Sequence, residues 1–181
     1  QMELLRGRVH RMEALIDGIL EYSRVGRVRG KAELVDLGQL LREVIDLLSP
    51  PDGGIVSVSP DMPSLVADRL RLQQVFMNLI GNAVKHHDRP AEARVEVSWR
   101  HAGDFHEFAV TDNGPGIDPK YHEKIFVIFQ TLAPRDKVER TGVGLSLVKK
   151  IVHSQGGTVT VESIPGRGAT FRFTCPKSPK E

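Results

Sequence analysis

Two parts of this chain alternate apolar and polar residues with the period of a β-strand, and each part contains a turn at its centre. Segments 94–100 and 105–111 flank Ala102-Gly103-Asp104, and segments 158–163 and 169–174 flank a Pro-Gly-Arg-Gly turn. Alternation around a short turn predicts an antiparallel hairpin in each case. Because helical patterns lie between and before these hairpins, the chain must combine a sheet with helices that cover it.

The helical patterns have recognisable starts and stops. Asp36 is placed to cap a helix over 37–48 that Pro50-Pro51 ends, and Asp68 is placed to cap a second helix that runs to His86. A third helix is expected over 143–155, with short strands at 55–58 and 65–67. The sequence therefore predicts an α/β protein, a two-layer α/β sandwich in which about three helices cover one face of a mixed sheet.

The first segment of the chain has a different character. From Leu5, apolar residues recur at Val9, Met12, Ile16 and Ile19, which is the spacing of a helix that packs in a coiled coil or bundle. About 25 helical residues span roughly 37 Å, too long to lie wholly on a domain of this size. We therefore expect a projecting helix that pairs with a partner. Glycines at 26 and 30 divide the chain into a helical unit, 1–30, and a second domain, 31–181.

Composition excludes several functional classes. Lysine and arginine total 25 against 23 acidic residues, which argues against a nucleic-acid partner or contact of this piece with an anionic membrane. No apolar run approaches the ~20 residues that span a bilayer, and Cys175 is the only cysteine, so a reducing cytoplasmic location is expected. The first residue is Gln1, which favours a fragment of a longer protein.

Three polar or glycine-rich motifs stand at element boundaries. The first is Asn78 with Asn82 and Lys85, whose spacing puts both amides on one helix face with a lysine one turn beyond. Amide oxygens suit Mg²⁺, and a lysine can neutralise phosphate charge. Two solvated surface asparagines are the alternative reading of this motif.

The second motif is the Asp112-Asn113-Gly114-Pro115-Gly116 turn at the end of an apolar strand. A carboxylate in such a pocket can accept a hydrogen bond from an exocyclic amino group, which selects adenine over a base that presents a carbonyl there. An ordinary turn between a strand and a loop is the alternative.

The third motif, Gly142-Val143-Gly144-Leu145, opens a helix where free N–H groups and the dipole favour phosphate. The polar stretch 131–141 before it contains Arg135, Lys137 and Arg140, and is expected to act as a mobile lid over a triphosphate or, alternatively, as a solvated loop. Taken together, the three motifs predict a site for ATP with Mg²⁺.

At these motifs the chain resembles the catalytic ATP-binding domain of sensor histidine kinases, within the wider family of Bergerat-fold ATPases. Segment 74–85 resembles the family's N box, 112–116 its first glycine box, 125–129 its F box and 142–145 its second glycine box. The resemblance covers 31–181. Residues 1–29, with Arg11-Met12 and Tyr22-Ser23-Arg24, are similar to the second helix of the dimerisation and histidine-phosphotransfer domain.

The resemblance implies a function and a set of site residues. The implied activity is transfer of the γ-phosphoryl group of ATP to a histidine, for relay to the receiver domain of a response regulator, by a homodimer paired through the N-terminal helix. Mg²⁺ would be held by Asn82 with Asn78 assisting, and the catalytic positions would be Asn78, Lys85, Arg135 and Arg140. The nucleotide contacts would come from Asn82, Asp112, Gly114, Gly116, Ile117, Phe126, Phe129, Thr141, Gly142, Val143, Gly144 and Leu145.

Two departures from related patterns qualify this expectation. Gyrase and heat-shock chaperone relatives carry glutamate at the position of Asn78, where it activates water, and an amide cannot act as that base. The acceptor histidine belongs to a first dimerisation helix that is missing here. His10 is a poor substitute because Arg11 follows it, whereas His86 is placed to line the pocket. The alternative function is a nucleotide-responsive binding module without phosphotransfer.

Overall fold

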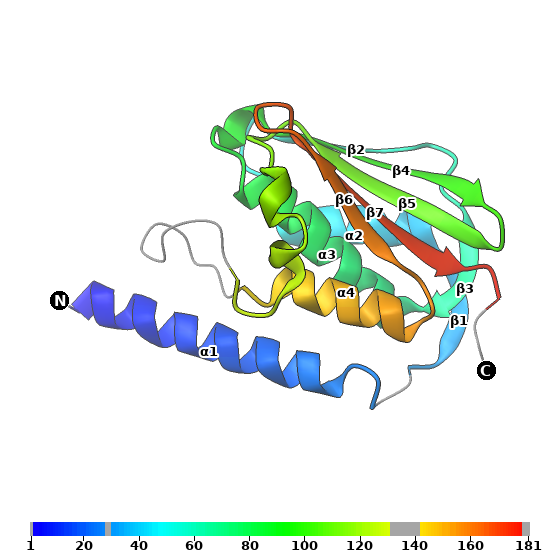
Figure 1. The fold of residues 1–181 in the computed structure, drawn as a ribbon, viewed down its shortest axis with the longest axis horizontal. Coiled ribbons are helices and arrows are strands. Elements are labelled where there is room, and N and C mark those ends of the chain that lie inside the picture. Colours follow the sequence, from blue (N-terminus) through cyan, green and yellow to red (C-terminus); the bar gives the residue numbers. More distant parts are fainter. Residues whose placement is uncertain (1, 28–29, 131–141, 179–181) are drawn as a thin grey trace.

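The computed structural model describes residues 2–27, 30–130 and 142–178. A five-stranded sheet has the order β2-β4-β5-β7-β6 and is mixed, since β2 pairs with β4 in parallel and the remaining neighbours are antiparallel (Figure 1). Its strands are β2 (Ile55–Val58), β4 (Arg94–Ala102), β5 (Phe105–Asp112), β6 (Val159–Ser163) and β7 (Ala169–Pro176). Both predicted hairpins are present.

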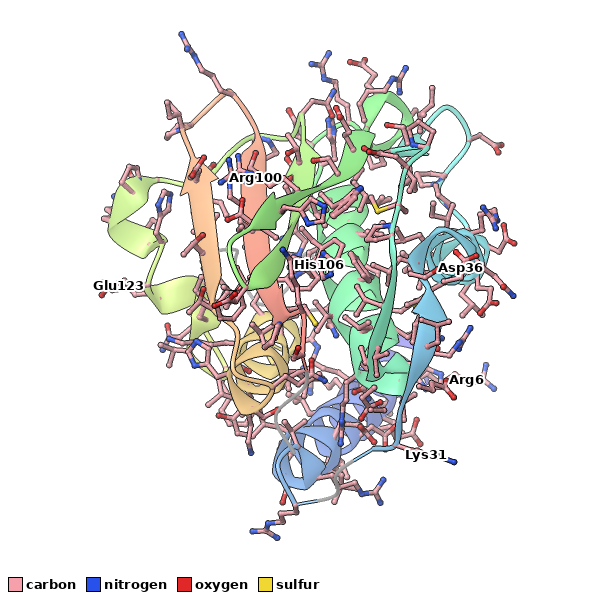
Figure 2. All side chains as sticks on the ribbon, turned by 90° about the vertical axis from the view of Figure 1, so that its right-hand side faces the viewer. Arg6, Lys31, Asp36, Arg100, His106 and Glu123 are labelled. Atoms are coloured by element: carbon pink, nitrogen blue, oxygen red, sulfur yellow. The ribbon has the colours of Figure 1, made fainter. Side chains whose placement is uncertain are left out.

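Three helices cover one face of this sheet (Figure 1): α2 (Leu37–Leu48), α3 (Arg69–Lys85) and α4 (Gly144–Ser154). The two predicted caps are formed, because Asp36 Oδ1 accepts the Gln39 N–H at 2.9 Å and Asp68 Oδ1 accepts the Arg71 N–H at 3.1 Å. Figure 2 shows Asp36 where the first strand passes into α2. The two-layer mixed α/β fold predicted from the sequence is confirmed.

The core lies between the two layers. Phe76 of α3 packs edge-to-face against Phe108 of β5 and Phe173 of β7, with ring centroids 5.8 and 5.3 Å apart. All three side chains are almost fully buried. A central aromatic cluster fixes the position of α3 along the sheet, which matters because α3 carries the asparagine motif.

A second, small sheet was not predicted. β1 (Ala32–Asp36), where the sequence indicated no strand, pairs antiparallel with β3 (Ser64–Asp68), which corresponds to the strand expected at 65–67. Only Val35 of β1 is buried, so the strand shows no apolar–polar alternation that could reveal it. Short 3₁₀ turns lie at Pro90–Glu92, Pro119–Tyr121 and Lys124–Phe126.

The first helix, α1 (Met2–Arg24), extends past α4 as expected, but its C-terminal half also packs on the domain (Figure 1). Glu21 accepts a hydrogen bond from Gln74 of α3 at 2.8 Å, and the Lys150 ammonium of α4 lies 4.1 Å from the Tyr22 ring centroid. Val25, just beyond α1, is 3% exposed. The apolar stripe of α1 faces another way and stays exposed. Across the described residues, no helix combines the length and apolar character that a membrane span requires.

Candidate functional site

The asparagine motif lies in the middle and C-terminal half of α3. Asn78 Nδ2 donates to the Gln74 carbonyl at 2.8 Å, which turns its Oδ1 toward the start of α4. A Cβ atom added to Gly144 would lie only 2.6 Å from Asn78 Oδ1, so the first and third motifs touch. The half-buried Asn82 amide has no hydrogen bond within the described part of the chain, and Lys85 is exposed on the last turn.

Asp112 ends β5 and turns its carboxylate back onto the following loop. Its Oδ1 accepts N–H groups of Gly114 at 2.8 Å and of Ala169 at 3.3 Å. Oδ2 makes no hydrogen bond to any described residue and remains available as an acceptor. Burial raises the pKa of Asp112 above its ordinary value of 3.8, although the two backbone hydrogen bonds oppose that rise.

The connection between β6 and β7 holds the glycine turn in place. Gly116 has a φ of 74°, and a Cβ there would lie 2.2 Å from the Ile164 carbonyl oxygen. The Ile117 N–H donates to Ser163 Oγ at 2.8 Å. A Cβ at Gly168 would lie 1.9 Å from the Asp112 carbonyl oxygen. The sequence indicated only a hairpin turn for this connection, because contacts between residues so distant in the chain leave no local signal.

The third motif begins α4. Gly142 has a φ of 67°, and its carbonyl accepts the Phe129 N–H at 2.8 Å. No side chain caps the start of α4 at Val143, which is 2% exposed and meets Gly18 of α1. In general, the N–H groups of the first turn of a helix and the positive end of its dipole favour an anionic ligand. Leu145 is partly buried and packs on the core.

The segment between β5 and α4 runs beside β6, as the position of Glu123 shows (Figure 2). On it, Phe126 packs edge-on against Phe171, 6.2 Å between centroids, with Lys149 Nζ 5.9 Å from its ring. Phe129 is instead 49% exposed with a φ of 66°. Three predicted site residues lie outside the described residues: Arg135, Arg140 and Thr141.

The structure places three histidines near the motifs or on α1. His86 caps the C-terminus of α3 and is exposed, whereas its neighbour His87 is buried and faces the aspartate turn. His10 is exposed on α1, and its Nδ1 lies 3.1 Å from Glu13 Oε2. The role of His87 was not predictable from the sequence, because a polar residue after a helix gives no sign that the chain turns it inward.

The donor set fits a hard cation that arrives with its own anionic ligands. In the described residues, no three histidine, cysteine, aspartate or glutamate side chains converge as a metal cluster. Mg²⁺ is usually held by one or two protein oxygens together with phosphate oxygens and water. Asn82, with no other partner within the described residues, and Asn78, whose Oδ1 is turned to the start of α4, offer such oxygens.

Comparison with known proteins agrees with this geometry. Residues 67–179, more than half of the chain, match the family of histidine kinase-, DNA gyrase B-, and HSP90-like ATPases. The phytochrome-like protein Cph1 of Synechocystis is 38% identical over 91% of this chain, which covers 22% of that protein. The structure of full-length ShkA in complex with AMPPNP is 30% identical, with a TM-score of 0.77 over 92% of this chain and 36% of that one.

A third relative is the histidine kinase ThkA, solved in complex with the response regulator protein TrrA. It is 25% identical, with a TM-score of 0.72, over 97% of this chain and 50% of that chain. The fold and the three motifs define an ATP-binding domain. The chain belongs to the histidine kinase-, DNA gyrase B-, and HSP90-like ATPase family. It spans about a fifth of the length of Cph1.

Proposed function

We propose that this chain is the ATP-binding catalytic core of a sensor histidine kinase, which transfers the γ-phosphoryl group of ATP to a histidine. The observation that carries the proposal is that the first and third motifs touch, while the turn after Asp112 is hydrogen-bonded to His87, just beyond the end of α3. Asn78 of α3 contacts Gly144 at the start of α4, and Asp112 is held at the end of β5 by Gly114 and Ala169. ShkA, a relative of the same fold, was solved with an ATP analogue.

Each part of the site has a proposed role. Asp112 Oδ2 accepts the adenine amino group, and Gly114, Gly116 and Ile117 form the turn beneath the base. The N–H groups at the start of α4, over 142–145, face the phosphates, with Lys85, Arg135, Arg140 and Thr141 contributing further contacts. Phe126 and Phe129 flank the segment that leads to 131–141.

Asn82, assisted by Asn78, would hold Mg²⁺, which when bound neutralises phosphate charge. Neither amide can take a proton from water, so neither supplies the base that fast ATP hydrolysis needs. Its residues instead position the triphosphate for attack by a better nucleophile, an imidazole nitrogen. We therefore expect slow hydrolysis and efficient transfer to histidine.

The histidine that receives the phosphoryl group is proposed to lie on a first dimerisation helix outside this chain, with residues 1–30 forming the second helix and 31–181 the catalytic domain. Leu5, Val9, Met12 and Ile16 are 52–61% exposed on α1, which supports pairing with a second copy. By analogy with ThkA and TrrA, a response regulator receiver domain would be the next recipient. The proposed activity consumes ATP, and Cys175 has a free thiol; both favour a cytoplasmic location.

Phosphotransfer is the direct test of this activity. The chain, extended upstream through the first dimerisation helix, is incubated with γ-labelled ATP and Mg²⁺, and the product is examined for acid-labile phosphohistidine. We expect label on the upstream histidine and none after that residue is changed to glutamine. ATP binding without any label would instead favour a nucleotide-responsive regulatory module.

A further inference from the structure

We propose that His87 is a positioning residue for nucleotide binding, which locks the Asp112 turn onto the C-terminal end of α3. This inference rests on the proposed adenine contact of Asp112. His87 does not touch the nucleotide in this account. It acts through Asn113, and it joins the amide half of the site on α3 to the aspartate half after β5.

The hydrogen bonds of His87 define its ring state. Its Nδ1 lies 2.9 Å from the Arg89 backbone N–H, which can only donate, so Nδ1 must be the acceptor. The proton is therefore on Nε2, which donates to Asn113 Oδ1 at 3.0 Å. The Asp88 carboxylate lies farther from Nδ1, at 3.4 Å, and is mostly exposed. A neutral ring with this tautomer satisfies both nitrogens.

Asn113 makes three further hydrogen bonds. Its Oδ1 also accepts the Arg94 N–H at 2.7 Å, its Nδ2 donates to the Glu92 carbonyl at 3.1 Å, and its backbone N–H donates to the Arg94 carbonyl at 3.2 Å. A side chain with all these bonds has one available position. Because Asn113 follows Asp112 directly, its position determines where the Asp112 carboxylate points.

The His87 ring also lies in contact distance of the turn. A Cβ at Gly114 would lie 3.8 Å from His87 Cδ2 and 2.9 Å from Asp112 Oδ1. The ring, the glycine and the carboxylate thus share one small space, and His87 is only 7% exposed. Loss of this partly buried hydrogen bond leaves Asn113 Oδ1 with one donor fewer and lets the turn shift.

Two amide substitutions separate the functions of the two ring nitrogens. In His87→Gln the amide can reach Asn113 in place of Nε2, but it gives up the bond from Arg89. In His87→Asn the shorter amide can accept the Arg89 N–H in place of Nδ1, but it cannot reach Asn113. The variants are matched in chemistry and differ in the bond that the proposal requires.

Affinity for AMPPNP with Mg²⁺, and for the guanine analogue, is measured by calorimetry on both variants and on the parent. We expect His87→Asn to bind AMPPNP about tenfold more weakly and to lose most of its preference for adenine, since about one hydrogen bond is removed. His87→Gln should stay within about threefold of the parent. A purely structural role would lower folding stability without changing the adenine preference of the folded protein.

The outcomes distinguish this inference from the proposed function. If the parent binds AMPPNP, Asp112→Asn does not, and His87→Asn matches the parent in affinity and preference, the role of His87 is refuted alone. If the parent itself fails to bind, the proposed function is refuted. Nitrogen-15 NMR of the parent's histidine rings gives a readout that needs no variant: Nδ1 of His87 must be unprotonated, and a proton on Nδ1 would overturn the proposal.

Discussion

At the scale of single residues, Asp112 combines partial burial with a specific set of partners. One carboxylate oxygen is used by the protein and the other is available to a ligand. Burial opposes ionisation and raises the pKa, so the group takes up a proton at a pH above the ordinary value of 3.8. The same shift means that the contribution of Asp112 to folding stability falls as the pH rises from 3.8 through the raised value.

The raised pKa predicts a pH dependence of nucleotide binding. The ionised carboxylate is the better acceptor for the adenine amino group, so affinity should fall as the pH drops through the raised pKa of Asp112. That loss should begin at a higher pH than an ordinary carboxyl group would give. Calorimetric titrations with AMPPNP across the acidic range measure it, and an affinity that stays constant until the protein unfolds would contradict the assignment.

Gly144 offers a second prediction at this scale. In Gly144→Ala the new methyl group meets Asn78 Oδ1, 2.6 Å away, and must displace the amide. Alanine stabilises a helix by roughly 0.5–1 kcal/mol relative to glycine. Because this gain offsets the cost of displacing the amide, the free energy of unfolding should change little. Affinity for nucleotide with Mg²⁺ should fall about tenfold, by loss of one oriented oxygen. Equal affinity in a folded Gly144→Ala protein would show that Asn78 does not serve the site.

At the scale of elements, the start of α3 depends on one side chain. Asp68→Ala removes the acceptor of the Arg71 N–H and should lower the free energy of unfolding by about 1 kcal/mol. Asp68→Asn keeps an oxygen in that position and should lose only a fraction of this. Urea denaturation of the two variants makes the comparison; an equal loss in both would mean that charge, and not the cap, is the stabilising feature.

Elements with local signals were predictable from sequence. α2 and α3 begin at Asp36 and Asp68 as expected, because an N-cap aspartate acts on the first turn of its own helix. β1 was not predictable, since it buries only Val35. The contacts of Ser163 and Gly168 with the aspartate turn were also not predictable, because they join residues about 50 positions apart.

The same distinction applies to the site. The sequence indicated Asn78, Asp112 and Gly144 by residue type and spacing, and the structure brings Asn78 and Gly144 into contact. The sequence indicated His86 as a residue of the pocket, but it gave no sign that the next residue, His87, is buried. Which of two adjacent histidines turns inward depends on the path of the chain after α3 toward β4, and that path is set by tertiary packing.

At the scale of the whole molecule, Cys175 reports on the integrity of the two-layer core. It lies on the inner side of β7, is 5% exposed, and burial raises its pKa to about 11. A protonated and inaccessible thiol should react slowly with alkylating reagents at neutral pH. We expect labelling to become fast only when denaturant unfolds the domain, as mass spectrometry can follow. Rapid labelling of the native protein would show that the sheet opens locally at β7.

The central claim is that Asp112 accepts a hydrogen bond from adenine in a nucleotide site formed by α3, the end of β5 and the start of α4. Calorimetry of AMPPNP with Mg²⁺ on the parent and on Asp112→Asn tests it most directly, because the substitution keeps the shape and removes the charged acceptor. We predict one site per chain in the parent and an affinity at least about tenfold lower in Asp112→Asn, the cost of a hydrogen bond to a charged group. Equal affinity in the two proteins would contradict the account.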